Sequence, residues 1–199
     1  MEQLNSPVIQ VLYQRMSLSP SARQRELGVS GLIRSGFGAA AIAAAAQLAP
    51  TSTGVGTLIM SLRNDFRATD ANSVAALGKA AADTTNPNTT FREAAAHALA
   101  AIHTTVALPW LAKLLDDTDA IIRAEGVIGL SSFANGLPVQ TTSNVASMAY
   151  LQPAGATPYR TADTAVNSAM GAATISQNEG RYLPFWKNWW AQNQGTLGN

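Results

Sequence analysis

One eight-residue pattern recurs along the chain and constrains its fold more than any other feature. Segments 25–32 and 123–130 both read R-x-x-G-V-x-G-L. Segment 92–99 keeps the arginine and the leucine and has alanine at the small positions, whereas a weaker copy at 51–58 has lost the arginine. Small residues spaced three apart share one face of a helix, where a second helix can approach closely. The pattern therefore predicts repeated, closely packed helices.

The apolar residues around these copies recur at spacings of three and four, which is typical of amphipathic helices. Short turns separate the predicted helices, so we expect consecutive helices to pack as antiparallel pairs. Asn135-Gly136 forms the expected C-cap of the last one. The expected pairs are 8–16 with 22–33, 39–48 with 54–63, 74–82 with 91–103, and 106–115 with 120–133.

Residues 91–136 combine three further features. A first helix is interrupted by Pro109, an acidic turn ends at Asp119, and Arg123 stands in the opening turn of a second helix rich in small residues. This arrangement resembles the HEAT repeat, and residues 6–33 resemble it less closely. The resemblance implies an all-α, right-handed α-solenoid of about four HEAT-like helical pairs. It also implies that the aspartate and arginine side chains link neighbouring repeats, and that the second helices line the concave face.

Five aromatic residues near the C-terminus follow helical spacing and fall on one face of a predicted helix over 182–191. They are Tyr182, Phe185, Trp186, Trp189 and Trp190. A solenoid needs a cap over the apolar face of its last repeat, so we expect this helix to be a buried C-terminal capping helix. Bacterial HEAT-like proteins often carry a similar aromatic ending. The alternative is an exposed aromatic anchor for a partner or a carbohydrate.

The chain changes character between the repeats and the aromatic helix. Proline, threonine and serine are frequent over 137–180, which predicts an irregular connection with one short helix over 162–172. We expect one continuous domain, because neighbouring repeats share a core. Its parts are the repeats over 1–136, the connection over 137–180, and the capping helix with its tail over 181–199.

Charge and composition argue against several functional classes. The chain has 13 Lys plus Arg against 12 Asp plus Glu, and this net charge of +1 gives no electrostatic footprint for nucleic acid. It has no cysteine, which excludes thiolate catalysis and Cys-ligated zinc. The most apolar run, 38–49, is too short to span a membrane. A native cytoplasmic start and a removed signal peptide both remain open, and the polar composition with few charges favours export.

The sequence contains no recognisable catalytic or metal-binding motif. Asp116, Asp117 and Asp119 lack the glycine and the distal glutamate of a calcium loop, and helix capping accounts for them. His97 and His103 are six residues apart and do not share a helix face. Nucleophile-elbow, phosphate-loop and dinucleotide motifs are missing as well. We therefore expect no metal and no cofactor.

These observations favour a non-enzymatic scaffold that binds a protein or peptide along its concave face, as a monomer rather than an oligomer. Candidates for linking neighbouring repeats or contacting the partner are Arg25, Arg92, Asp119 and Arg123. One alternative is an enzyme or enzyme subunit similar to the HEAT-like lyases or glycosylases, which would need His97, His103 or a carboxylate as base. The other is an envelope- or carbohydrate-associated module that uses the C-terminal tryptophans.

Overall fold

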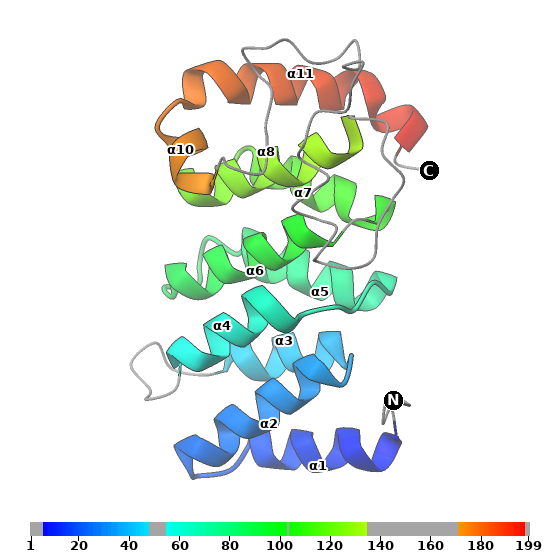
Figure 1. Cartoon of the computed structure of the whole chain (residues 1–199), viewed down its shortest axis with the longest axis vertical. Helices are drawn as coiled ribbons and strands as arrows, with labels where there is room; N and C mark the ends of the chain where they lie inside the picture. The colour runs from blue at the N-terminus through cyan, green and yellow to red at the C-terminus, as the bar shows by residue number, and fades with distance from the viewer. Residues whose placement is uncertain (1–5, 48–54, 103, 135–170, 198–199) are drawn as a thin grey trace. The chain divides into compact units, whose positions relative to one another are not determined.

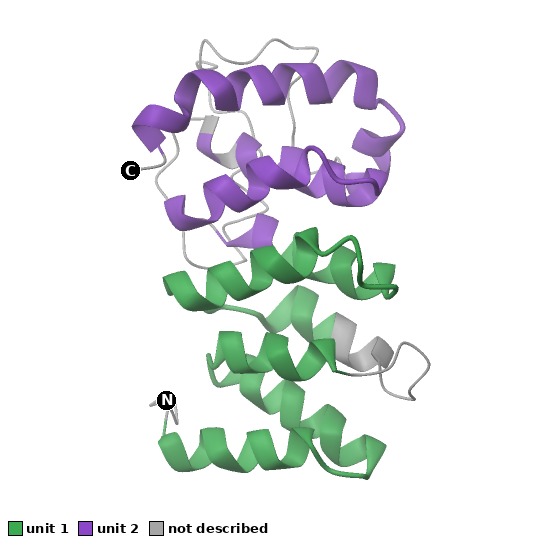
Figure 2. Ribbon diagram, turned by 180° about the vertical axis from the view of Figure 1, so that it is seen from behind, with its two compact units in different colours: residues 1–98 green, residues 99–199 purple. Residues whose placement is uncertain are grey.

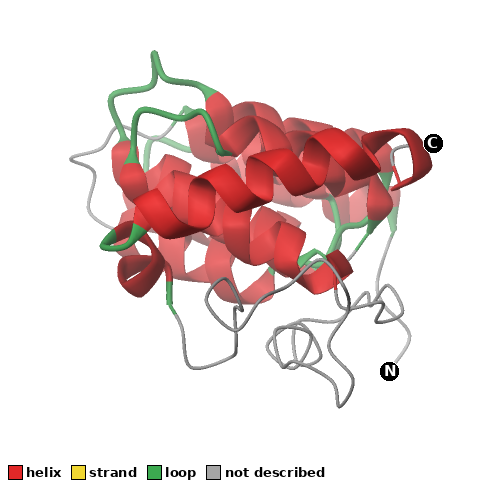
Figure 3. Cartoon of the chain, turned by 90° about the horizontal axis from the view of Figure 1, so that it is seen from above, coloured by secondary structure: helices red, strands yellow, loops and turns green. Residues whose placement is uncertain are grey.

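The computed structural model describes residues 6–47, 55–102, 104–134 and 171–197, and every regular element in those ranges is a helix. Figure 3, coloured by secondary structure, shows these helices joined by loops. The chain divides into two compact units, Met1–Ala98 and Leu99–Asn199, which Figure 2 distinguishes by colour. The fold is thus an all-α solenoid built from helical pairs.

The first unit is a two-layered stack of helices. Helix α1 packs against α2, α2 packs against both α3 and α4, and α3 packs against α5. The first helices of successive pairs, α1, α3 and α5, therefore form one layer, and the second helices α2 and α4 belong to the other (Figure 1). The bounds are α1 Pro7–Ser17, α2 Ala22–Arg34, α3 Gly38–Ala46, α4 Val55–Asp65, α5 Ala71–Ala82 and α6 Thr89–Ala101, whose last turn belongs to the second unit.

The second unit contains one helical pair and the C-terminal helices. Helix α7 packs along α8, and α11 packs on both of them, while the short α10 packs on α8 (Figure 1). The bounds are the 3-10 turn η1 Thr105–Ala107, α7 Leu108–Leu114, α8 Ala120–Ala134, α10 Ala172–Ser176 and α11 Glu179–Leu197.

The observed helices differ from the predicted ones at three places. Pro109 does not interrupt its helix but stands in the first turn of α7, where a missing backbone N–H costs no intrahelical hydrogen bond. Helix α11 extends beyond the predicted 182–191 at both ends. The predicted connection over 137–180 contains the short helix α10 near its end. The short helix predicted over 162–172 falls largely outside the described residues. Asn135-Gly136 and His103 lie outside them as well.

The first glycine of the repeated motif brings the two helices of a pair into backbone contact. A Cβ atom on Gly28 would lie 2.6 Å from the carbonyl oxygen of Tyr13 in α1. A Cβ atom on Gly126 would lie 2.8 Å from the carbonyl oxygen of Leu111 in α7. Both separations are shorter than a side-chain carbon tolerates, so only glycine permits this spacing. In α6 the same motif position holds Ala95, which is fully buried.

The other conserved positions of the motif complete the contact between paired helices. The second glycines, Gly31 and Gly129, face the ring of Tyr13 and the side chain of Leu111. The closing leucine of each clear copy is fully buried, as the motif predicts for an anchor of the core. These leucines are Leu32, Leu99 and Leu130.

Replacing Gly126 with alanine should lower the free energy of unfolding by about 1–3 kcal/mol, because the added methyl group forces α8 away from α7. Urea unfolding followed by circular dichroism measures the change. Gly180→Ala is the matched control, since a Cβ atom there meets open space within helix α11. It should be neutral or stabilising by about 0.5–1 kcal/mol. Equal effects of the two substitutions would contradict the close approach.

Candidate functional site

Two of the motif arginines bind the turn that precedes their own helix. Nη1 of Arg25 donates hydrogen bonds to the carbonyl oxygens of Ser19 and Pro20, both at 2.8 Å. Nη1 of Arg123 donates to the corresponding carbonyl oxygens of Asp117 and Thr118, at 2.7 and 2.9 Å. Each guanidinium therefore closes the turn of its own helical pair. The link between neighbouring repeats that the family resemblance implies for the aspartate and the arginine stays a prediction.

The aspartates before α8 shape the same turn. Oδ1 of Asp119 accepts hydrogen bonds from the backbone N–H groups of Ile121 and Ile122, at 2.8 and 3.1 Å, as expected of an N-cap. Oδ1 of Asp117 accepts from the N–H of Asp119 at 2.9 Å. The carboxylates of Asp117 and Asp119 therefore have a structural role within this turn.

The turn before α6 repeats this arrangement with amides in place of carboxylates. Oδ1 of Asn88 accepts a hydrogen bond from the N–H of Phe91 at 3.0 Å, and Oδ1 of Asn86 accepts from the N–H of Asn88 at 2.9 Å. The two asparagines are therefore the counterparts of Asp119 and Asp117. Asn86 and Asn88 stand six and four residues before the motif arginine, as Asp117 and Asp119 do before theirs. This shared spacing is the sequence signal that identifies them.

Arg123 also connects its helix to the beginning of α11. Its Nε and Nη2 atoms donate to the two carboxylate oxygens of Glu179, at 2.8 and 2.7 Å. This two-pronged contact raises the pKa of Arg123, chiefly through the hydrogen bonds to Glu179. The side chains are only 20% and 23% exposed, so water screens the ion pair less than it screens an open surface pair. Glu179 was not among the predicted site residues.

The third motif arginine is enclosed by its surroundings. Arg92 is only 4% exposed. It lies close enough to Asp83 for its charge to help lower the pKa of that carboxyl, although the hydrogen bonds from Thr85 lower it more. Arg92 therefore does not present its guanidinium to a large partner in solution.

Helix α11 covers α8 and α7 with its aromatic side chains. Trp186 is fully buried, and Tyr182 and Trp189 are 5% and 3% exposed. The rings of Trp186 and Trp189 meet edge to face, with centroids 5.6 Å apart. Phe185 and Trp190 are half-buried. Three of the five predicted aromatic residues thus form a packed contact, as a capping helix requires.

Residues 29–131 match a family model described as HEAT repeats. The chain belongs to the HEAT-repeat family. No curated protein and no solved structure matches this sequence. The matched region begins inside α2 and ends inside α8, so it leaves out α1 as well as the capping helix. The aromatic cap and Glu179 therefore lie outside the part of this HEAT protein that matches the family.

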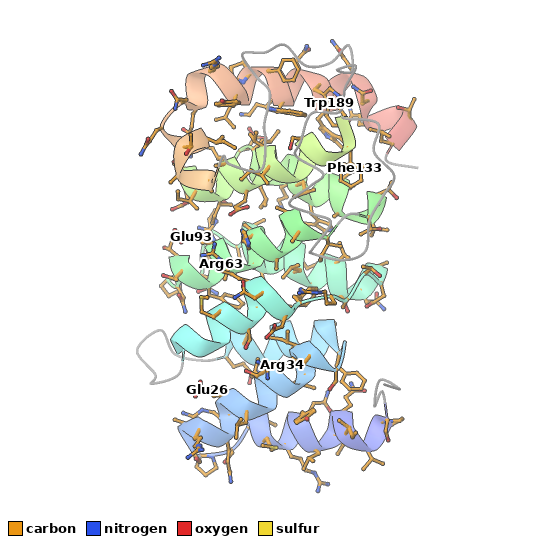
Figure 4. The ribbon with its side chains drawn as sticks, viewed as in Figure 1. Glu26, Arg34, Arg63, Glu93, Phe133 and Trp189 are labelled. Atoms are coloured by element: carbon orange, nitrogen blue, oxygen red, sulfur yellow. The ribbon has the colours of Figure 1, made fainter. Side chains whose placement is uncertain are left out.

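The second HEAT helices of the first unit present an exposed surface of mixed character. Helices α2 and α4 meet at the hydroxyl groups of Ser30 and Ser61, which are 3.4 Å apart, and Nε of Arg34 contacts Asp65 at 3.1 Å. Figure 4 shows Glu26, Arg34, Arg63 and Glu93, from α2, α4 and α6, along one side of this unit. Two large apolar side chains of α2 and α4 are about half exposed: Leu27 at 52% and Met60 at 54%.

The structure also places the residues that a catalytic or metal site would use. His97 is half-buried in α6. Within the described ranges, no three acidic, histidine or cysteine side chains come together as a metal site would need. The same ranges contain no helix with both the length and the apolarity of a membrane span.

Glu179→Gln should lower the free energy of unfolding by about 1–2 kcal/mol, because it removes the charge from a partly buried pair of hydrogen bonds. Urea unfolding followed by tryptophan fluorescence reports on this change directly, since three of the four tryptophans lie in α11. Asp116→Asn breaks the exposed Lys187–Asp116 pair and should cost less than about 0.5 kcal/mol. A larger loss from Asp116→Asn than from Glu179→Gln would contradict the assignment.

Trp186→Ala should lower the free energy of unfolding by about 3–5 kcal/mol, because it empties a fully buried site between α11 and its neighbours. Trp190→Ala should cost much less, since that side chain is half-buried. Thermal unfolding by calorimetry compares the two variants. Equal stabilities would mean that α11 does not serve as a cap.

Proposed function

We propose that this HEAT-repeat protein is a non-enzymatic scaffold that binds a protein or peptide segment on the exposed side of its second helices. HEAT repeats commonly serve as protein-interaction scaffolds. The observation that carries the proposal is the pair Leu27 and Met60, two large apolar side chains left half exposed on adjacent helices. Apolar anchors surrounded by charged groups are the usual composition of a binding hot spot and its rim.

The charged groups on the same two helices suggest the chemistry of the bound segment. Arg23 and Arg63 are exposed on the same helices. Arg34 is 68% exposed even though it contacts Asp65. Arginine recognises carboxylates through paired hydrogen bonds. We therefore expect a segment in which one or two apolar side chains are flanked by aspartate or glutamate.

The proposed surface uses different residues from the motif arginines. Arg25 and Arg123 are bound to turn carbonyl oxygens, and Arg92 is nearly enclosed. Changing any of these three would disturb the fold of a repeat as well as its surface. Leu27 and Met60 are better probes, because half-exposed side chains contribute less to the core.

The alternatives have less support. An enzyme of the HEAT-like lyase type would need a base in a pocket; of its two candidate histidines, His97 is half-buried and His103 lies outside the described residues. A carbohydrate module would need open tryptophan faces, and Trp186 and Trp189 are buried. The burial of these two tryptophans favours the scaffold over the carbohydrate module.

The test is to select binding segments from phage-displayed fragments of the source genome, using the full chain as target. The affinity of each enriched segment is then measured by fluorescence anisotropy for wild type and for the double variant Leu27→Ser, Met60→Ser. We expect at least about a tenfold loss of affinity, since hot-spot side chains commonly contribute more than about 1 kcal/mol each. The melting temperature should stay close to that of wild type.

Val106→Ser is the matched control, because Val106 is 41% exposed but belongs to η1. It should bind like wild type. Failure to enrich any segment, or equal binding by the double variant, would count against the proposal. Glycan binding that disappears in Trp190→Ala would favour the carbohydrate module instead.

A further inference from the structure

Methionine supplies all the sulfur of this chain, which has five methionines and no cysteine. Two of the methionines belong to the described residues. Met16 in α1 is half-buried, whereas Met60 in α4 is 54% exposed. Oxidation by peroxide depends on access to the sulfur atom, so Met60 is the more reactive of the two.

The place of Met60 on the surface gives its oxidation a consequence. Met60 is one of the two apolar anchors of the proposed binding surface, so the effect of its oxidation on binding rests on that proposed function. The other anchor, Leu27 in α2, is an aliphatic side chain of similar exposure that peroxide does not modify. The two anchors therefore differ in their ability to take up oxygen.

Hydrogen-bond donors follow Met60 on the same face of α4. Arg63 and Asn64 lie three and four residues further along the helix, and both are exposed. Side chains at these spacings are neighbours on the surface of a helix. The thioether of Met60 is only a weak acceptor, whereas a guanidinium is a strong donor. An oxygen atom added to the sulfur would therefore lie within reach of Arg63.

We propose that Met60 is a reversible oxidation site that switches off the binding surface. Hydrogen peroxide transfers one oxygen atom to Sδ: the O–O bond breaks, a sulfur–oxygen bond forms, sulfur loses two electrons and water is released. The sulfoxide oxygen accepts a hydrogen bond from the guanidinium of Arg63. Methionine sulfoxide reductase with a dithiol reverses the step, because the dithiol becomes a disulfide and the oxygen leaves as water.

One oxygen atom thereby changes two parts of the binding surface. The sulfoxide is polar, so covering it with an apolar side chain of the bound segment costs free energy that covering a thioether does not. The same oxygen engages Arg63, one of the arginines that the proposed function assigns to carboxylates of the segment. A bound segment in turn covers Met60, so binding and oxidation oppose each other reciprocally.

Peptide mapping by mass spectrometry tests the site without a binding partner. The full chain is treated with hydrogen peroxide, and the sulfoxide at each methionine is followed over time. Met60 should oxidise faster than Met16, and methionine sulfoxide reductase with dithiothreitol should restore it. Equal rates at the two methionines, or a Met60 sulfoxide that the reductase leaves unchanged, would overturn the assignment of Met60 as a reversible site.

Fluorescence anisotropy with the enriched segments tests the switch. Each protein is compared with its own affinity before treatment, because Met60 and Arg63 belong to the binding surface. Peroxide should weaken binding by wild type at least about fivefold, since a polar group then replaces an apolar contact. Met60→Leu should lose less than about twofold, because it has an apolar anchor without sulfur. Met16→Leu is the matched control and should lose as much as wild type.

Two further measurements address Arg63 and the covering of Met60. Arg63→Ala should lose less affinity on oxidation than wild type, because the sulfoxide has no guanidinium left to engage; an equal loss would overturn the contact with Arg63. A saturating segment should slow the oxidation of Met60 and leave the rate at Met16 unchanged. Oxidation of Met60 at the same rate with and without the segment would overturn the reciprocal link.

The outcomes separate the switch from the function on which it rests. Equal loss of affinity in wild type and in Met60→Leu would overturn the switch at Met60. A reduced protein that binds no segment would refute the proposed function, and the switch with it. A protein whose binding survives complete oxidation of Met60 would refute the switch and leave the proposed function standing.

Discussion

The backbone contact at the first motif glycine is the constraint on which the α1–α2 and α7–α8 pairs depend. At Gly28 and Gly126 the second helix approaches so closely that a methyl group would collide with a carbonyl oxygen of the first. The close approach at these glycines sets the distance between the two helices of a pair. It also brings the arginine three residues earlier within reach of the turn carbonyls, as Arg25 and Arg123 demonstrate. The leucine four residues beyond the glycine then enters the core.

Local patterns in the sequence predicted the helices, the N-cap at Asp119 and the buried leucines well. Glycine and leucine spacing identified the paired helices because each helix repeats its contacts every three or four residues. Asp119 was recognisable as a cap because capping acts within one turn. Pro109 was misinterpreted as an interruption because the sequence alone did not locate the first residue of α7.

Contacts between distant segments could not be predicted in this way. Glu179 is 56 residues from Arg123, in a stretch without periodicity, and a single acidic residue carries no signal of its partner. The family pattern suggested that the arginine would bridge repeats. Arg25 and Arg123 bind carbonyl oxygens of their own turns, where the ends of helices leave such groups without intrahelical partners. The remaining N–H groups of Arg123 bind Glu179 at the beginning of α11.

The turn contacts of Arg25 and Arg123 also bear on how such a chain can change its length during evolution. Each arginine binds carbonyl oxygens five and six residues before it, all within one helical pair. A gene duplication that copies such a pair would copy the donor, the acceptors and the glycine together. The new pair would bring its own turn geometry and would require few compensating changes in its neighbours. Copy number could thus evolve separately from the surface that each copy exposes.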